Sequence, residues 1–434
     1  MRLQMVPRNV VFSTLKREFH YEVSGLGLDN EEFVYKLLDR RWALSSPESK
    51  IHQVFISDKC KEGDGVIRKV SYKNNPHPSL GDVMVERNPQ QPSFYVVRDD
   101  LRHPLVNGNK ARKLDALLPF LEDHSITDVV TCGGLQSAHT AAVAVSCSER
   151  GLKAHLLVRG EQPQILTGYA LISTLYGHVK YVPRSLYAKR EDMLLKHAEM
   201  VAHSGGSVLH LNDLLRNPFK LHSLPRDDIS KFNAPIGTKK VAIVNEGAGD
   251  AVALLGVIRL VQFLSQKHLF GNDQKLKIVI DAGTGTTATG LGLGAELLGL
   301  PWEVIAIMLA DTVDGYREKE KSLISEFCSS YQSSVVKHNS SRINNGIVQW
   351  VQRTLPRKFG NILDGEIQEC QRIARQTGIL VDPVYTLAAW ELASKLSFED
   401  EDAKVLMIHT GGTLGMFGLA QRYKSCFQGL NESE

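Results

Sequence analysis

The sequence predicts a two-domain α/β protein with parallel-rich sheets and helices on both faces. Short apolar segments alternate with helical patterns along most of the chain, and glycines such as Gly151 and Gly177 close several of the helical patterns. Repeated strand–helix–strand units of this kind form parallel sheets. Strands are expected at 93–98, 128–132, 153–158, 178–182, 207–211, 240–244, 275–281, 302–308 and 404–409.

Helices are expected between these strands. The segment 111–124 shows the clearest pattern, because its leucines at 114, 117, 118 and 121 share one helical face. Residues 212–239 are polar and contain three prolines, so they are expected to connect two units. The other expected helices are one that ends at Arg150 and those at 165–176, 189–203, 250–267, 290–298, 365–377 and 385–395.

The order of these elements suggests how the chain divides. We expect a large domain interrupted by a smaller inserted one. The expected parts are an N-terminal extension at 1–75, a large domain at 76–123 plus 236–425, a small domain at 124–235 and a tail at 426–434.

Composition excludes several classes of protein. The 434 residues are 43% hydrophobic and 23% charged, which is typical of a soluble globular protein. A net charge of +3 is too small to favour a nucleic acid or a membrane surface as partner. No apolar run reaches the roughly 18–20 residues of a membrane span. The six cysteines form no CxxC pair, so neither a metal site nor a disulfide framework is expected.

The N-terminus resembles a targeting segment. Residues 1–17 contain four basic residues and no acidic one. This pattern is typical of a transit peptide and favours the mitochondrial matrix. A plain basic tail on a cytoplasmic or plastid protein is the alternative.

The loop 281–290, DAGTGTTATG, is the first candidate site. An apolar strand enters it and a helix leaves it, so its N–H groups can bind a phosphate. Gly283 and Gly285 allow close approach of the backbone. Hydroxyl donors come from Thr284, Thr286 and Thr287. The loop lacks a Walker lysine, and alanine at position 288 breaks the dinucleotide pattern. A tight structural turn, or another kind of nucleotide-binding α/β protein, is the alternative.

Lys110 becomes a candidate site residue when it is considered together with this loop. It opens a predicted helix within 107–114, NGNKARKL. A lone lysine usually lies on a solvated face. A phosphorylated aldehyde cofactor, however, needs one amine for a Schiff base and one cradle for its phosphate.

Three further segments follow predicted strands or precede predicted helices. The segment 133–139, GGLQSAH, can bind a substrate carboxylate through N–H groups and Ser137, although Ser137 also suits a helix cap. In 381–386, VDPVYT, Tyr385 is either a site residue or a core aromatic. In 408–412, IHTGG, His409 lies where ligands collect in α/β sheets, or it is a satisfied strand histidine.

Together these segments resemble the family of D-cysteine desulfhydrase and 1-aminocyclopropane-1-carboxylate deaminase. Its members are pyridoxal 5'-phosphate enzymes with the tryptophan-synthase-β type of fold. The resemblance covers about residues 78–425 and is specific because six motifs occur in one order. They are RDD at 98–100, GNKARKL at 108–114, GGLQSAH at 133–139, GTGTT at 283–287, DPVYT at 382–386 and HTGG at 409–412.

The resemblance implies roles for individual residues. Lys110 would carry the cofactor, and 283–287 would bind its phosphate. Ser137 would bind the substrate carboxylate and assist proton transfer, and Tyr385 would lie near the substrate amine. Thr386 would hydrogen-bond the pyridine nitrogen. It also implies that Asn109 lies at the cofactor and that Gln136 and His139 lie at the substrate.

Three positions bear on the reaction. The deaminases resemble one another in having glutamate where this chain has Thr386, so we expect a weaker electron sink and simple β-elimination. The expected reaction converts D-cysteine to pyruvate, ammonia and hydrogen sulfide. Ala138 replaces the family's usual asparagine, and Phe359 aligns with a second active-site tyrosine. Ring-opening deamination and a cofactor-binding protein of low activity are the alternatives. The resemblance also implies a homodimer.

Overall fold

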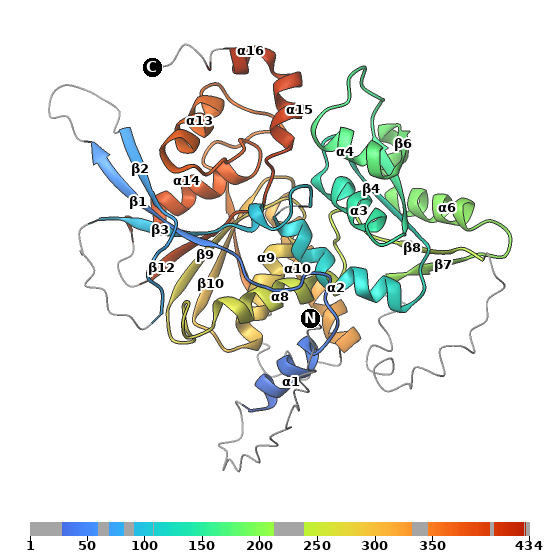
Figure 1. Ribbon diagram of the computed structural model, residues 1–434, viewed down its shortest axis with the longest axis horizontal. Helices are drawn as coiled ribbons and strands as arrows, with labels where there is room; N and C mark the ends of the chain where they lie inside the picture. Colours follow the sequence, from blue (N-terminus) through green and yellow to red (C-terminus); the bar gives the residue numbers. More distant parts are fainter. Residues whose placement is uncertain are drawn as a thin grey trace, which may run out of the picture.

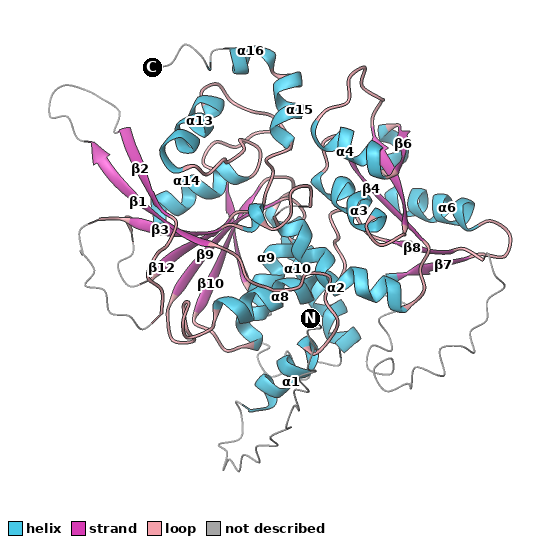
Figure 2. Cartoon of the chain, viewed as in Figure 1, coloured by secondary structure: helices cyan, strands magenta, loops and turns pink. Residues whose placement is uncertain are grey.

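The computed structural model describes residues 28–59, 69–81, 91–106, 108–211, 238–331, 346–399, 403–428 and 430. These residues form two sheets that lie beside each other (Figures 1 and 2). The larger sheet has the order β11 (Val348–Gln352), β10 (Trp302–Met308), β9 (Leu276–Ala282), β12 (Lys404–Ile408), β3 (Ser93–Val97), β1 (Ile51–Lys59) and β2 (Lys69–Asn75). The smaller has the order β6 (His178–Val182), β5 (Lys153–Arg159), β4 (Asp128–Gly134), β8 (Lys240–Ile243) and β7 (Ser207–His210).

Both sheets are rich in parallel strands. All pairs in the smaller sheet are parallel, and so are those from β11 to β3 in the larger one. Only β1 runs antiparallel to its neighbours β3 and β2. The central strands are continuous apolar runs because helices cover them on both sides.

Helices cover both faces of the larger sheet (Figure 1). The α8 (Val252–Leu264) and α9 (Thr286–Leu297) side buries Val257 and Leu291 against Ile278. The opposite side buries Ile373 of α13 (Glu366–Thr377) and Trp390 of α14 (Thr386–Leu396). The predicted α/β class with helices on both faces is therefore confirmed.

The smaller sheet is covered in the same way. Its core on one face joins β4 and β5 to α6 (Arg190–Ala202), with Leu194 packed near Val130. On the other face, Val143 of α3 (Ala138–Ser148) belongs to the core cluster that also contains α2 (Asn109–Asp123). Other elements in the described ranges are α1 (Leu28–Leu38), α4 (Gly168–Tyr176), α5 (Arg184–Tyr187), α10 (Val313–Tyr331), α15 (Gly415–Arg422), α16 (Lys424–Gln428) and the 3-10 turn Asp99–Leu101.

Several boundaries differ from the sequence expectations. Strands β1 and β2 lie in the larger sheet, although 51–75 was expected in an extension before the core. Strand β8 pairs within the smaller sheet, although it was assigned to the larger domain. The helix expected from residue 290 begins at Thr286. The elements α1, α10 and β11 were not predicted. The transit segment and most of the polar connection at 212–239 lie outside the described residues. The two-domain division stays a prediction.

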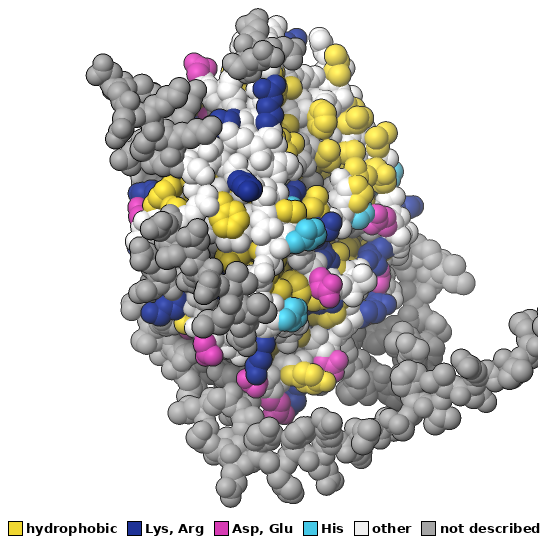
Figure 3. Space-filling model, turned by 60° about the vertical axis from the view of Figure 1, so that its left-hand side comes forward, with side chains coloured by type: hydrophobic (Ala, Val, Ile, Leu, Met, Phe, Trp, Pro, Cys, Tyr) yellow, Lys and Arg dark blue, Asp and Glu magenta, His cyan; other side chains and the backbone are white. Residues whose placement is uncertain are grey.

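Part of the surface is apolar. Figure 3 shows hydrophobic side chains gathered over one part of the face drawn. Among the described residues, Ile165, Leu175 and Phe417 are 60–68% exposed. No helix in the described ranges is long and apolar enough to cross a membrane.

Candidate active site

Loops from the larger sheet meet at the first turn of α2. Gly108 has a φ of 65°, and a Cβ there would lie 1.8 Å from the Thr410 carbonyl oxygen. The N–H of Asn109 donates to the same oxygen at 3.3 Å. The Asn109 side chain donates to Thr287 Oγ at 3.2 Å. The first turn of α2 therefore lies between the loops that follow β12 and β9.

Lys110 lies in this turn with an altered basicity. Its Nζ donates to Asn109 Oδ1 at 2.8 Å. Burial removes water from the ammonium and lowers the pKa of Lys110 to about 8, although the nearby Asp281 carboxylate opposes the shift. A larger fraction of this amine is therefore neutral, and hence nucleophilic, than in an exposed lysine.

Lys113 is a site residue that the sequence analysis missed. It lies one turn after Lys110 and is 2% exposed. Its Nζ donates to the Gly247 carbonyl at 2.9 Å and lies 3.4 Å from Thr284 Oγ. Burial, followed by the charges of Lys110 and Lys319, lowers its pKa well below the ordinary value. The spacing of three residues from Lys110 was the available signal.

The predicted phosphate loop has the expected form. Gly285 has a φ of 80° and directly precedes α9, so the N–H groups of the first helical turn face the loop. Thr284 and Thr286 place their hydroxyl oxygens 3.1 Å apart. The Tyr316 hydroxyl, which has one proton to donate, lies 2.6 Å from the Ala282 carbonyl oxygen and 2.9 Å from that of Gly283. These contacts fix the loop that Lys113 faces.

The 133–139 segment also lies between a strand and a helix. Ser137 caps α3 by accepting the Thr140 N–H at 3.3 Å. His139 is 2% exposed, and its Nε2 lies 2.8 Å from Thr131 Oγ. Burial, with the charges of Lys110 and Lys113, lowers the pKa of His139 well below its usual value. Its Nδ1 has no hydrogen-bond partner among the described residues.

Gln136 uses its amide within the protein. Its Nε2 donates to the Thr167 carbonyl at 3.0 Å, and its Oε1 accepts the Tyr169 N–H at 3.0 Å. These bonds join the 133–139 segment to the start of α4. The side chain expected at the substrate thus connects two elements of the protein, and its contact with substrate stays a prediction.

The Thr386 hydroxyl is occupied by a neighbouring carboxylate. It donates to Asp382 Oδ2 at 2.9 Å and accepts the Asp382 N–H at 2.7 Å. Its expected bond to a pyridine nitrogen would require this donor to turn away from Asp382.

Tyr385 lies beside Gly283, where a Cβ would be 3.5 Å from the ring. The Phe359 ring lies 5.6 Å from the Tyr385 ring, centroid to centroid. The alignment of Phe359 with a second active-site tyrosine stays a prediction.

His409 is bonded within the fold. Its Nε2 lies 2.9 Å from the Leu380 carbonyl, so the satisfied-histidine reading describes its environment. The next residue, Thr410, donates to Asp281 Oδ1 at 2.6 Å. Burial raises the pKa of Asp281 to about 7. Asp281, the first residue of the loop 281–290, is therefore a buried carboxyl near Lys110, and the sequence pattern gave its side chain no role.

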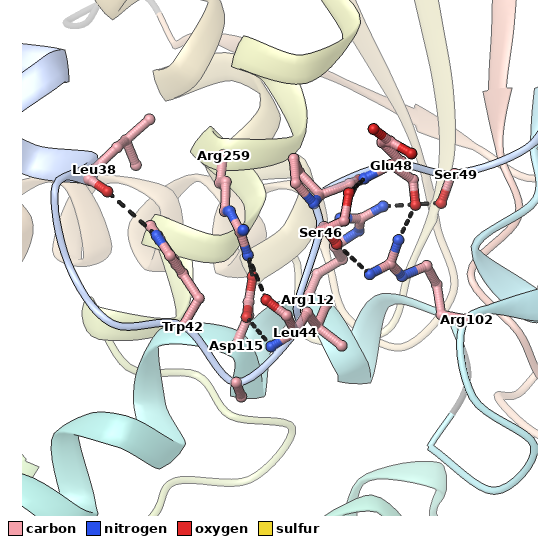
Figure 4. Close-up of polar contacts among 12 residues, drawn as sticks. Leu38, Trp42, Leu44, Ser46, Glu48, Ser49, Arg102, Arg112, Asp115 and Arg259 are labelled. Carbon is pink, nitrogen blue, oxygen red and sulfur yellow. Dashed lines mark hydrogen bonds and ion pairs between the residues drawn. The ribbon is translucent and has the colours of Figure 1, made fainter. Parts of the chain in front are cut away.

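The opposite face of α2 is held by an extended segment, residues 39–50, which we call the strap. Arg112 is 1% exposed and donates to Asp99 at 2.8 and 3.1 Å, to the Pro47 carbonyl at 2.7 Å and to Ser49 Oγ at 2.9 Å. Figure 4 shows part of this network. These bonds fix α2 directly behind the first turn.

A second group of contacts lies one turn further along α2. Asp115 accepts the Leu44 N–H at 2.7 Å and Arg259 Nη1 at 2.8 Å (Figure 4). The Arg259 guanidinium lies over the Trp42 ring, 4.6 Å from its centroid. The strap therefore sets both the position and the rotation of the helix that carries Lys110 and Lys113.

The site fits a phosphorylated aldehyde. At Gly283 a Cβ would make only an ordinary contact with Tyr385, so the loop leaves room there. Lys113 is buried against the loop and Lys110 is partly buried beside Asn109, and neither has an ion-pair partner among the described residues. The orphaned Nδ1 of His139 offers a further polar contact. Lys113, Asn109 and the loop could hold a phosphate, and Lys110 could bond an aldehyde carbon. No group of three or more potential metal ligands is found in the described part of the chain.

Comparison with known proteins identifies relatives. A rice (Oryza sativa subsp. japonica) protein, provisionally named D-cysteine desulfhydrase 2, mitochondrial, is 50% identical over 398 residues, which cover 89% of this chain and 93% of that protein. The Arabidopsis thaliana bifunctional D-cysteine desulfhydrase/1-aminocyclopropane-1-carboxylate deaminase, mitochondrial, is 25% identical over 342 residues, or 76% of this chain and 74% of that protein. No family model matches the chain.

A solved structure supports the fold. The crystal structure of an ACC deaminase homologue superposes with a TM-score of 0.62 at 22% identity, over 91% of this chain and 98% of that one. The rice protein is similar enough, and matched over enough of its length, to show the family. The family predicted from the six ordered motifs is thereby confirmed. The chain belongs to the family of D-cysteine desulfhydrases and 1-aminocyclopropane-1-carboxylate deaminases, pyridoxal-phosphate lyases with the tryptophan-synthase-β type of fold.

Proposed function

We propose that this chain binds pyridoxal 5'-phosphate at Lys110 and eliminates the β-substituent of a small amino acid, with D-cysteine as substrate. The observation that carries the proposal is a pair of lysines on one face of α2, of which Lys113 is buried and Lys110 partly buried. Lys113 faces the loop after β9, Lys110 lies near Asp281 at the end of β9, and both lysines have lowered pKa values. The names of the rice and Arabidopsis relatives supply the substrate.

Each residue then has one task. Lys113 and the 283–287 loop hold the phosphate, since charged donors bind it best. The amine of Lys110, partly neutral, would hold the cofactor through its aldehyde carbon and, once free of it, would accept the Cα proton of the substrate. Ser137 and neighbouring N–H groups hold the carboxylate, and Tyr385 positions the amino group. When bound, the cofactor supplies an electron sink for the pair left on Cα. D-Cysteine and one water yield pyruvate, ammonia and hydrogen sulfide, which balances.

The competing reaction is ring opening of 1-aminocyclopropane-1-carboxylate, which the name of the Arabidopsis relative includes. Thr386 favours elimination, because its hydroxyl already donates to Asp382 and it brings no carboxylate of its own to the ring. Purified protein should form pyruvate and sulfide from D-cysteine and little 2-oxobutyrate from the cyclopropane substrate. Faster 2-oxobutyrate formation would reverse this assignment, and L-cysteine serves as the control for chirality.

Low activity is the second alternative, and Ala138 motivates it. Ala138 begins α3 next to the Ser137 cap, where the family usually has asparagine. If the missing amide limits cofactor binding, Ala138→Asn should raise both affinity for pyridoxal phosphate and turnover. Unchanged values in that variant would show that Ala138 is not limiting.

We also propose import into mitochondria and assembly as a homodimer. The basic, acid-free segment 1–17 and the name of the rice relative support the first proposal. The exposed apolar residues on α4 and α15 support the second, since such patches favour association. Imaging of a fluorescent fusion with and without residues 1–17 tests localisation. Sedimentation of the purified protein tests assembly.

A further inference from the structure

Tyr169 lies between the two sheets and has no assigned role. It belongs to the first turn of α4, beside the smaller sheet, and is 2% exposed. Its N–H donates to Gln136 Oε1 at 3.0 Å, and Gln136 Nε2 returns a bond to the Thr167 carbonyl. The backbone of Tyr169 is therefore joined to the segment that ends in Ser137.

The phenol of Tyr169 contacts the loop that follows β12 of the larger sheet. Its hydroxyl forms hydrogen bonds with backbone groups of Gly412 and Leu414, in the loop that follows β12. A Cβ on Gly415 would lie 3.5 Å from the ring. The side chain thus spans from the smaller sheet to the 410–415 loop of the larger one.

Glycines allow this close approach on both sides. A Cβ on Gly168 would lie 2.6 Å from the Leu414 carbonyl oxygen, and one on Gly418 would lie 2.4 Å from Gln136 Cδ. A side chain at Gly168 would push the start of α4 away from the start of α15, and one at Gly418 would push α15 away from the Gln136 side chain. The contact around Tyr169 is therefore tightly packed, and small residues keep it so.

The 410–415 loop continues the connection to Tyr385. A Cβ on Gly412 would lie 2.4 Å from Asp382 Oδ2. Asp382 Oδ1 in turn accepts the N–H groups of Val384 and Tyr385, at 2.9 and 3.0 Å. Displacement of this loop would therefore reach the backbone of Tyr385.

We propose that Tyr169 is a positioning residue that joins the two sheets across the site. We call its contacts with Gln136 and with the 410–415 loop the clasp. Tyr169 holds the segment ending in Ser137 and the Asp382–Tyr385 turn at a fixed distance from each other. One substrate molecule can then bind Ser137 through its carboxylate and Tyr385 through its amine at the same time. This role rests on the proposed function, because it assigns the carboxylate to Ser137 and the amine to Tyr385. It predicts an effect on substrate binding more than on cofactor binding, whose residues lie on α2 and the 283–287 loop.

Tyr169→Phe tests the clasp, because it removes the hydroxyl and keeps the ring. Tyr181→Phe is the matched control: Tyr181 belongs to β6 of the same sheet, and its hydroxyl bonds Thr174 away from the 410–415 loop. Loss of one hydrogen-bonded hydroxyl should raise the KM for D-cysteine about fivefold to tenfold in Tyr169→Phe. We expect kcat, the Kd for pyridoxal phosphate and the KM of Tyr181→Phe to stay within about twofold of wild type. Equal losses of cofactor and substrate affinity, or a KM like that of the control, would overturn the role.

A second readout does not depend on the cofactor or on D-cysteine. Hydrogen exchange of the full chain without added pyridoxal phosphate should speed up in both 165–176 and 410–418 when Tyr169 is changed to Phe. Tyr181→Phe should leave 410–418 at the wild-type rate. If exchange rises only in 165–176, the phenol does not join the two sheets and the clasp is wrong. Failure of wild type to bind pyridoxal phosphate would instead refute the proposed function, and the exchange result would still decide the clasp.

Discussion

The two faces of helix α2 differ in whether their charged side chains have partners of opposite charge. On the strap face, Arg112 is paired with Asp99 and Asp115 with Arg259, all within 3.1 Å. On the opposite face, which we call the lysine face, Lys113 is buried and Lys110 partly buried, with neutral partners such as Asn109 and the Gly247 carbonyl. Paired buried charges fix a structure, whereas a buried cation facing neutral groups costs stability unless a ligand compensates it. The difference supports the proposal that the lysine face binds an anion.

The largest effect expected from this difference between the two faces follows the removal of one charge from the strap face. Arg112→Ala leaves Asp99 buried without its guanidinium, and we expect a loss of about 3–5 kcal/mol in the free energy of unfolding. Chemical denaturation measures this loss. Arg41→Ala is the matched control, because Arg41 lies in the same strap but pairs with Glu122 and Asp123 at the surface. Its loss should not exceed about 1 kcal/mol. Similar losses in both variants would show that burial of the Arg112 pair adds nothing.

Removing a charge from the lysine face should have a different result. Lys113→Met deletes an ammonium whose burial is unfavourable, so the protein without cofactor should be at least as stable as wild type. Affinity for pyridoxal phosphate should fall about 10- to 100-fold, since a charged hydrogen bond to phosphate is lost. Fluorescence titration measures the affinity. Lys153→Met, at an exposed position of β5, is the control. A Kd unchanged by Lys113→Met would remove Lys113 from the phosphate site.

The smallest expected effect concerns pH. A lowered ammonium pKa means that the neutral amine appears at a lower pH than in an exposed lysine. With a pKa of about 8 for Lys110, the rate of its bonding to pyridoxal phosphate should rise about fivefold from pH 7 to 8 and level off above pH 9. Borohydride reduction followed by peptide mass analysis measures this rate at Lys110. A rate that keeps rising tenfold per pH unit to pH 10 would indicate an ordinary lysine.

Local sequence pattern predicts the loops of the candidate site. Gly283 to Thr287 follow an apolar strand and lead into helix α9, which begins at Thr286, so the pattern predicts an anion site there, and this site stays a prediction. The leucines of α2 likewise predicted a buried face, and Leu117 is fully buried. These features depend on neighbours in sequence, which periodicity and turn chemistry describe.

The parts that sequence could not predict depend on distant contacts. Lys113 looks like a solvated lysine until the Gly247 loop is seen against it. Strand β2 is an edge strand of the larger sheet, and it was not predicted because its composition is polar. Tyr169 gives no local signal, because its partners lie in the loop after the last strand. The occupied hydroxyl of Thr386 likewise shows only once Asp382 is placed.

The central claim is that Lys110 carries pyridoxal phosphate, and the visible spectrum tests it most directly. Wild type reconstituted with the cofactor should show the absorption band of a lysine-bound aldehyde. Lys110→Ala should lack this band, whereas Lys113→Met should keep it at a higher cofactor concentration. Addition of D-cysteine to wild type should then change the band and release pyruvate and sulfide. A wild-type protein without a Lys110-dependent band after reconstitution would contradict the account and leave the 283–287 loop as an anion site for another ligand.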